Sequence, residues 1–361
     1  MPKVIRFAGL LLAAGMACGT AAADEKIPLV GASEKEAAEG WLTLFDGKTT
    51  FGWKVEGDVK VEKGALVIGG TKPSRAETTS RFSSGNVGGE CSLAPSTPEG
   101  KSATFTGLLT EGLGPSISKD RNEIVPGMRG FVGTRDTGGE PKPLGFEVPA
   151  GVVLRVTGVR IQPVPRRFLP LLNGKDLSGW KVFQDPKRSK SKFAVTKDGE
   201  LHVTDGPGDL QTEGKYADFV LQLECKTNGK HLNSGVFFRC VPDQYQNGYE
   251  AQIHNGFKGD DRTKPTDFGT GAIYRRVPAR KVVANDNEWF TLTVVANGPR
   301  IATWVNGYQT ADWTDDRKPA DNPRQGLRTA AGHLSIQGHD PTTDILFRNI
   351  RIAELKANPE R

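Results

Sequence analysis

The stretch Gly235–His254, GVFFRCVPDQYQNGYEAQIH, contains two runs that are typical of β-strands, Gly235–Val241 and Tyr249–His254. A polar turn with proline and glycine joins them. Apolar and polar residues alternate in the second run, and side chains two apart on a strand point to the same face. One face is therefore predicted to carry a carboxylate, an amide and an imidazole. These belong to Glu250, Gln252 and His254.

Short strand-like runs continue through the chain on both sides of this hairpin. Turn signals such as Asn247-Gly248 and Asn306-Gly307 separate them, and helix-period segments are scarce, with 34–39 as one short candidate. This spacing predicts an all-β antiparallel sandwich or jelly roll. The main strand candidates are 199–204, 217–227, 235–241, 249–254, 289–297, 300–305, 333–337 and 344–354.

The chain contains a degenerate internal sequence repeat. Trp41–Lys48, followed by Gly52-Trp53-Lys54-Val55, recurs as Leu169–Lys175, followed by Gly179-Trp180-Lys181-Val182. Self-similarity over this length indicates two related domains rather than a solenoid. We expect a degenerate β-sandwich repeat at 38–165 and a full jelly roll at 168–357, with a stiff linker at Pro163–Arg167.

The two copies are unequal, because the first lacks the region that holds Glu250 and its neighbours. The histidines at 202, 231, 254, 333 and 339 all lie in the second copy. We therefore expect the chemistry in the second copy and interpret the truncated first copy as a packing or binding partner.

Composition indicates an ordinary globular protein without a nucleic-acid surface. The formal net charge is +6, and two of the positive charges belong to Lys3 and Arg6 near the N-terminus. The densest basic cluster, Lys187–Lys192, has no interleaved aromatic residues, so we interpret it as a solvated loop.

The N-terminus predicts a secretory leader at 1–23. Lys3 and Arg6 precede an apolar run, and Ala21-Ala22-Ala23 supplies a small-residue cleavage site. The run is too short for a transmembrane helix, and lipidation at Cys18 is the less favoured alternative. We expect an exported protein, periplasmic or extracellular, with no transmembrane segment. Cys91, Cys225 and Cys240 then remain, an odd number that favours buried thiols over a disulfide framework.

Polar residues on several predicted strands would meet on one concave sheet face. Arg239 alternates with Phe238 and Cys240, and Gln337 alternates with Ile336. If the apolar sides fill the core, the opposite face has the groups that general acid–base chemistry on a polyol-like ligand requires. The set is Arg239, Glu250, Gln252, His254, Gln337 and His339.

The second copy resembles the 3-keto-disaccharide hydrolase domain family. The motifs that carry the resemblance are Leu172–Trp180, Asn233–Arg239, Gly248–Ile253, Thr270–Tyr274, Trp304–Gly307, Gly332–Gln337 and Phe347–Ile352. They cover essentially all of 168–356 in the family's order, and the resemblance is faint over 38–165. It implies a concanavalin A-like jelly roll that cleaves or binds sugars, with 3-keto-glycosides as substrates of characterised members.

A ketone at C3 acidifies the C2 proton, so the substituent at C1 can leave by elimination. We expect Glu250 or His254 as base, His339 as acid, and Arg239 with Gln252 as enolate clamp. A divalent metal ion held by Glu250 and His254 is an alternative electrophile, although no cofactor is certain. Further saccharide-binding candidates are Asn233, Gln337 and, as a stacking platform, Tyr274.

Two other functions stay open at this point. The same face could grip a saccharide without turning it over, as a carbohydrate-binding module of the cell envelope does. The other alternative, a structural protein of the cell envelope, would neither bind nor cleave a saccharide. The Glu250, His254 and His339 set favours the enzyme.

Overall fold

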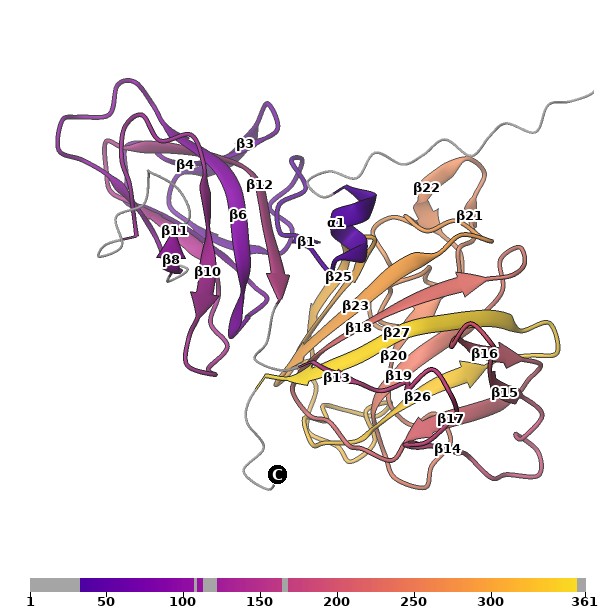
Figure 1. The fold of residues 1–361 in the computed structure, drawn as a ribbon. Helices are drawn as coiled ribbons and strands as arrows, with labels where there is room; N and C mark the ends of the chain where they lie inside the picture. The colour runs from indigo at the N-terminus through magenta and orange to yellow at the C-terminus, as the bar shows by residue number, and fades with distance from the viewer. Residues whose placement is uncertain (1–32, 107–108, 113–121, 164–167, 356–361) are drawn as a thin grey trace, which may run out of the picture.

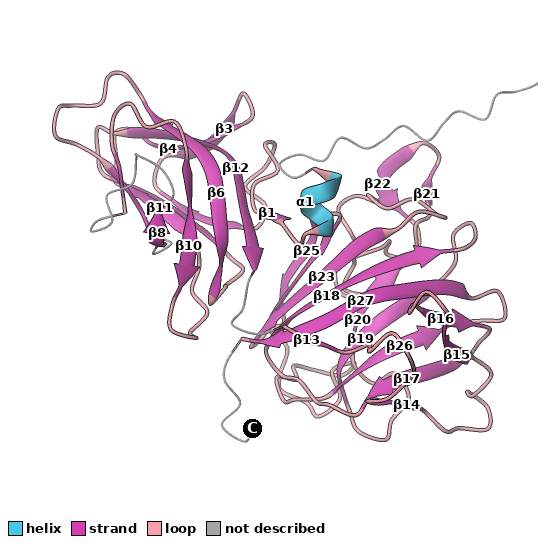
Figure 2. Cartoon of the chain, in the orientation of Figure 1, coloured by secondary structure: helices cyan, strands magenta, loops and turns pink. Residues whose placement is uncertain are grey.

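A computed structural model describes residues 33–106, 109–112, 122–163 and 168–355. Nearly all of this part is β-structure, as Figure 2 shows. The one helix among the described residues, α1 (Glu34–Ala38), is capped by Ser33 and Glu36 and matches the short helix predicted there. No helix in these ranges is long and apolar enough to cross a membrane. The predicted leader at 1–23, with Cys18, lies outside the described residues.

The N-terminal unit, 42–163, is a sandwich of two antiparallel sheets. The larger sheet has the order β3-β4-β12-β6-β10-β8, with β1 beside β12. Its strands are β1 (Leu42–Thr43), β3 (Val59–Glu62), β4 (Ala65–Gly69), β6 (Ser84–Leu93), β8 (Leu109–Gly112), β10 (Phe131–Asp136) and β12 (Val153–Pro163). The smaller sheet, β2-β5-β11-β7-β9, consists of β2 (Trp53–Glu56), β5 (Ser74–Thr78), β7 (Ala103–Phe105), β9 (Glu123–Ile124) and β11 (Gly145–Val148).

The C-terminal unit, 169–354, is a second sandwich. Its larger sheet has the order β15-β16-β27-β18-β23-β24-β25, with β13 beside β27. The strands of this sheet are β13 (Leu169–Pro170), β15 (Lys192–Val195), β16 (Leu201–Thr204), β18 (Phe219–Thr227), β23 (Phe290–Asn297), β24 (Arg300–Val305), β25 (Tyr308–Thr314) and β27 (Asp344–Glu354). The smaller sheet, β14-β17-β26-β19-β20, contains β14 (Trp180–Val182), β17 (Gly208–Thr212), β19 (Ser234–Cys240), β20 (Tyr249–Ile253) and β26 (His333–Gly338). A separate hairpin pairs β21 (Phe257–Lys258) with β22 (Asp261–Pro265).

The same strand order occurs in both units. The smaller sheets correspond strand by strand, and so do the first five strands of the larger sheets. The N-terminal unit therefore has a counterpart of the Glu250 strand in β9, contrary to the prediction that the first copy lacks this region. A marked difference is the connection between the last strand of the smaller sheet and the next strand of the larger sheet. That connection is residues 125–130 in the N-terminal unit and 254–289 in the C-terminal unit. The longer connection supplies one wall of the pocket described below.

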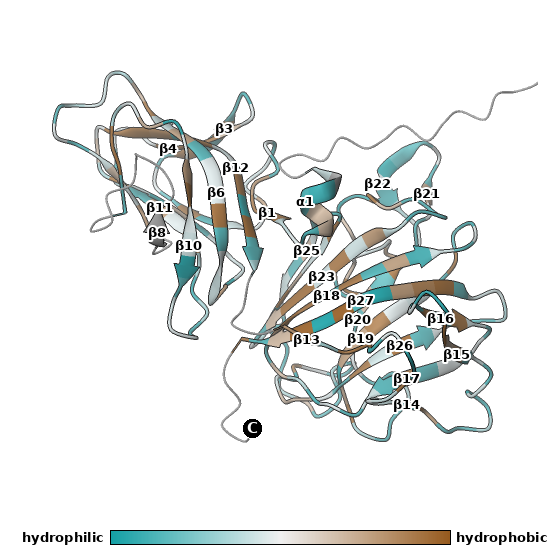
Figure 3. Ribbon diagram, viewed as in Figure 1, coloured by the Kyte–Doolittle hydropathy of each residue, from teal (hydrophilic) through white to brown (hydrophobic). Residues whose placement is uncertain are grey.

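Alternating hydropathy builds both cores. Along β12 and β27, hydrophobic residues alternate with hydrophilic ones (Figure 3), as expected for strands with one face on a core. Each core draws large buried side chains from both of its sheets, such as Val87 and Phe146 in the first unit, and Leu221 and Phe238 in the second. The predicted all-β fold of two sandwiches is confirmed. The described cysteines, Cys91, Cys225 and Cys240, are buried free thiols.

The two units touch where β1 lies beside β25 and α1 beside β23, as Figure 1 shows. The amide of Thr43 donates to the carbonyl of Gly307, and the indole of Trp304 donates back to the carbonyl of Thr43. Trp304 packs with the core of the N-terminal unit rather than the core of its own. The N-terminal unit therefore covers the outer face of the larger sheet of the second sandwich, because Val220, Val295 and Ala302 join Trp304 in its core cluster.

Candidate active site

The site starts from the pairing of β19 with β20. Glu250 lies opposite Phe237, and Gln252 lies opposite Gly235. A Cβ atom at position 235 would lie 2.5 Å from Oε1 of Glu250. Gly235 therefore leaves the space that the Glu250 carboxyl fills.

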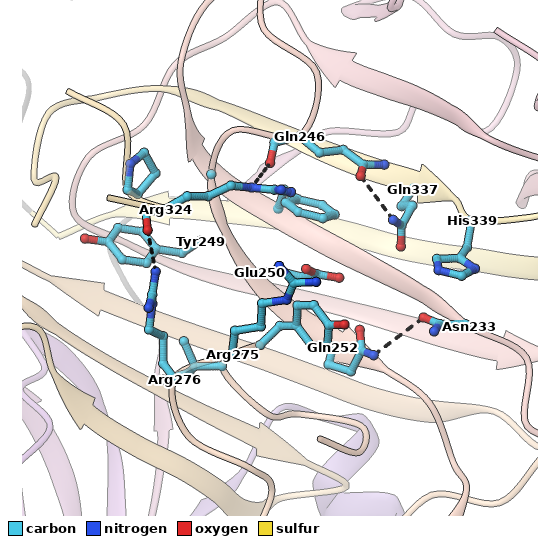
Figure 4. Close-up of a pocket in the computed structure, with 15 residues that line it drawn as sticks. Asn233, Gln246, Tyr249, Glu250, Gln252, Arg275, Arg276, Arg324, Gln337 and His339 are labelled. Atoms are coloured by element: carbon cyan, nitrogen blue, oxygen red, sulfur yellow. Dashed lines mark hydrogen bonds between the residues drawn. The ribbon is translucent and has the colours of Figure 1, made fainter. Parts of the chain in front are cut away.

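A pocket of about 450 Å³ opens over this part of the smaller sheet (Figure 4). Strands β19, β20 and β26 form its floor, and loops at 273–276 and 323–324 form its walls. Every residue of β19 and β20 is buried, because one face meets the core and loops cover much of the other. Apart from the tyrosines Tyr249 and Tyr274, the charged or titratable residues of the lining are Glu250, Arg275, Arg276, Arg324 and His339.

The Glu250 carboxyl is the central feature of the pocket. Glu250 is 8% exposed, and no residue of the described chain gives its carboxyl a hydrogen bond or an ion pair. Burial raises the pKa of Glu250 to about 8, although the charges of Arg324 and Arg275 oppose this shift. The group is therefore mostly protonated at neutral pH, whereas the sequence suggested an ionised base.

His339 follows β26 and forms a pair with Asp340. Its Nδ1 lies 2.7 Å from Oδ2 of Asp340, and its backbone amide donates to Oγ1 of Thr343. An Nδ1–H that donates to the carboxylate leaves Nε2 as the basic nitrogen. Burial acts against ionisation of Asp340, yet hydrogen bonds from Thr342 and His339 hold its pKa below the usual value. His339 thus has the arrangement of an oriented base.

Side-chain amides line the rest of the floor. Nε2 of Gln252 donates to the Asp267 carboxylate over 2.9 Å, and Nδ2 of Asn233 donates to the same carboxylate over 2.6 Å. Nε2 of Gln337 donates to Oε1 of Gln246 over 3.1 Å. These contacts leave three buried polar atoms without a protein partner: Nε2 of Gln246, Oε1 of Gln252 and Oε1 of Gln337. Unsatisfied polar atoms in a pocket are suited to a ligand rich in hydroxyl groups.

Six of the predicted site residues line the pocket. They are Asn233, Glu250, Gln252, Tyr274, Gln337 and His339. Tyr274 comes from the long connection 254–289, and its ring packs edge-on against Phe268 at 5.1 Å.

Arg239 does not line the pocket, contrary to the prediction. Its side chain is fully buried and donates to the carbonyls of Ala217, Gly298 and Arg328 and to the carboxylate of Asp218. The strict alternation that the prediction assumed fails because the register with β26 shifts between Phe237 and Cys240. Arg239 is an anchor of the fold.

His254 also lies away from the pocket lining. Strand β20 ends at Ile253, so alternation no longer controls the direction of the next side chain. Its ring centroid lies 6.0 Å from that of His231, and Nδ1 accepts from the amide of Gly256. The predicted metal pair of Glu250 and His254 is thus not brought together in this pocket. Among the described residues, no group of three or more His, Cys, Asp or Glu side chains could hold a metal ion.

Sequence reasoning missed the three arginines and Gln246, which come from loops. The backbone carbonyl of Arg324 accepts from the guanidinium of Arg276 over 2.8 Å, and Nε of Arg324 donates to the carbonyl of Gln246. These bonds tie the two pocket walls together. The adjacent pair Arg275-Arg276, directly after the Thr270–Tyr274 motif, was the available signal.

The strand order defines a protein of two antiparallel β-sandwiches, and the second sandwich carries a polar pocket. The model of the 3-keto-alpha-glucoside-1,2-lyase-like domain matches residues 167–353, just over half of the chain. The chain belongs to this family. None of the curated proteins matches it.

Solved structures give weaker likenesses. Two candidate glycosyl hydrolases from Parabacteroides distasonis are 22% and 25% identical, with TM-scores of 0.43 and 0.40; each match covers 52% of this chain, and 94% and 99% of the respective relatives. A carbohydrate-binding module from Bacillus subtilis is 16% identical, with a TM-score of 0.33 over 48% of this chain and 93% of its own. The family assignment rests on the sequence match and not on these scores.

Proposed function

We propose that the C-terminal unit is a lyase that cleaves 3-keto-glycosides by acid–base chemistry. The observation that carries the proposal is the buried, unpartnered Glu250 carboxyl on the floor of a pocket that is also lined by His339, the partner of Asp340. Membership of the 3-keto-alpha-glucoside-1,2-lyase-like family supports the same substrate class.

The protonated state of Glu250 and the orientation of His339 decide their roles. His339, oriented by Asp340, takes the proton from C2 of the sugar, and the C2–H electrons form a C1=C2 double bond. The C1–O bond breaks, and protonated Glu250 gives its proton to the leaving oxygen. The products are an alcohol and an unsaturated 3-keto sugar, and transfer of the proton from His339 back to Glu250 restores the enzyme. These roles reverse those expected from the sequence.

The C3 oxygen gains negative charge as the C2 proton leaves. In place of Arg239, we assign Nε2 of Gln246 to this oxygen, because it is a buried donor without a partner on the pocket wall. Gln252 already uses Nε2 for Asp267, so its free Oε1 is suited to accept from a sugar hydroxyl. Tyr274 supplies an aromatic face on the same wall.

The test compares Glu250→Gln with the wild type on a 3-keto-glucoside. Loss of a general acid lowers turnover by about 10²- to 10⁴-fold, and glutamine keeps the shape of the side chain. Glu213→Gln, at an exposed position, is the matched control and should turn over normally. Unchanged turnover in Glu250→Gln would contradict the proposal.

A carbohydrate-binding module is the second candidate. The unpartnered amide atoms of Gln246, Gln252 and Gln337 favour it, since they could hold hydroxyl groups without chemistry. Saccharide binding without turnover, indifferent to Glu250→Gln, would identify such a module.

We also propose that the chain is exported after removal of 1–23 and that 38–165 and 168–357 are its two domains. N-terminal sequencing of the mature protein tests the first point and should begin at Asp24; a lipid on Cys18 would contradict it. Limited proteolysis tests the second and should cut first within 163–167.

A further inference from the structure

We propose that the pocket accepts a sugar with an anionic substituent, such as a carboxylate or a sulfate ester. The inference rests on the sugar-binding pocket proposed above and extends it to the class of substrate. The observation that carries it is the charge of the lining, which contains three arginines and a single carboxyl.

That carboxyl does not neutralise the arginines. Glu250 makes no ion pair within 4 Å in the described chain and is buried. Two neighbouring carboxylates are already engaged: Asp267 accepts from Asn233 and Gln252, and Asp340 pairs with His339. The pocket therefore carries a surplus of positive charge, and the exposed Arg275 and Arg324 place part of it where an anion from solution can reach it.

Two of the arginines have guanidinium N–H groups without a hydrogen-bond acceptor among the described residues. Arg324 uses only Nε, in the bond to Gln246, so both terminal nitrogens lack a partner within the described residues. Arg275 makes no hydrogen bond or ion pair there, and its guanidinium lies 5.3 Å from the ring centroid of Tyr274. In Figure 4 the Glu250 carboxyl is drawn between these two side chains. Arg276 differs, because it is occupied by the carbonyl of Arg324.

The backbone of Arg275 has a strained conformation. Its φ of 58° is in the left-handed region, which a non-glycine residue adopts only when its surroundings require it. The amides of Arg276 and Val277 both bond to the carbonyl of Ile273 and so close this turn. A tight turn presents the guanidinium to the pocket, where its planar fork suits bidentate binding of a carboxylate or sulfate.

The experiment measures binding of three probes that share one ring. They are methyl α-D-glucopyranoside, the corresponding uronate, and the corresponding 6-sulfate, titrated by calorimetry at low and high salt. At least one anionic probe should bind about tenfold more tightly than the neutral one, with less preference at high salt. The preferred probe distinguishes a carboxylate from a sulfate.

The variants assign any preference to the two arginines. Arg275→Gln, which removes no protein contact except the tyrosine stacking, should reduce the preference, and Arg275→Gln with Arg324→Gln should abolish it. Arg129→Gln, at an exposed position of the N-terminal unit, should leave it unchanged. Absence of any preference for an anionic probe, absence of binding, or a preference that survives the double variant would overturn the inference.

Turnover assays separate this inference from the proposed lyase. Cleavage of a neutral 3-keto-glucoside, without a preference for either anionic probe, would overturn the anionic subsite and leave the lyase. Preferential binding of the uronate, without cleavage of the 3-keto derivative of either the neutral glucoside or the uronate, would overturn the lyase and leave the anionic subsite.

Discussion

Arg280 of the C-terminal unit forms an ion pair with Asp46 of the N-terminal unit, with Nη2 and Oδ2 2.6 Å apart. The same guanidinium lies 4.0 Å from the ring centroid of Phe51. Arg280 is on the long connection that carries Tyr274 and Arg275 into the pocket. The N-terminal unit thus holds the far end of the segment that forms a pocket wall.

Asp46→Ala should lower both stability and substrate affinity. The pair is largely buried, so its loss leaves the Arg280 guanidinium with a hydrogen bond to Thr49 but no ion pair, and costs about 2 kcal/mol of unfolding free energy. A looser wall should raise KM more than it lowers kcat. Denaturant unfolding and steady-state kinetics measure the two effects. Glu56→Ala, from an exposed ion pair with Lys54, is the control. An unchanged KM would show that the wall is independent of this contact.

Arg239→Ala should destabilise the fold rather than act on chemistry. It removes hydrogen bonds to three carbonyls and to Asp218 from a fully buried position, which costs about 3–5 kcal/mol. Chemical denaturation gives the stability, and activity per folded molecule, measured at low temperature, should be retained. A normally stable variant without activity would instead place Arg239 in the reaction.

Gly235→Ala should impair the reaction while the fold survives. The added methyl group would lie 2.5 Å from Oε1 of Glu250, the far end of a flexible side chain that can move away. A displacement of about 1 Å can cost up to 10²-fold in rate. Gly88→Ala, where the nearest atom is 3.7 Å away, is a suitable control. If kcat is normal in Gly235→Ala, the position of the carboxyl is not critical.

The rate should fall as the pH rises through about 8. A general acid must be protonated, and burial raises the pKa of Glu250 to about 8. A rate that rises over this range would instead indicate that Glu250 acts as the base. The pH profile of kcat/KM reports this ionisation in the free enzyme, and the Glu250→Gln variant should lose that limb.

Stability should also fall as pH rises from about 4.5 to 8. The folded state binds the Glu250 proton more tightly than the unfolded state, so folding loses its advantage as that proton leaves. Asp209, fully buried and bonded to Ser335 and Gln211, contributes in the same direction, because burial raises its pKa to about 7. Glu250→Gln should therefore flatten the pH dependence of unfolding only in part; an unchanged slope would contradict the burial effect.

The regular strands were predictable from sequence, and the loops were not. Alternation placed Glu250, Gln252 and Gln337 on one face, and the structure has them there. The same rule failed for Arg239 at a register shift and for His254 beyond the end of a strand. Neither the register shift nor the end of the strand is visible in the alternation of apolar and polar residues.

The missed arginines have a different cause. Arg276 and Arg324 lie in connections without a regular hydrophobic period, and their contact depends on the paths of two separate loops. The protonation of Glu250 was equally hidden. It depends on how completely the loops bury the carboxyl, whereas sequence shows only that charged neighbours exist.

The most direct test of the proposed lyase is the primary kinetic isotope effect on cleavage of a 3-keto-glucoside that carries deuterium at C2. We expect slower release of the alcohol from the deuterated substrate, with an unsaturated 3-keto sugar as the second product. Release at the same rate from both substrates, with no unsaturated sugar formed, would contradict this expectation.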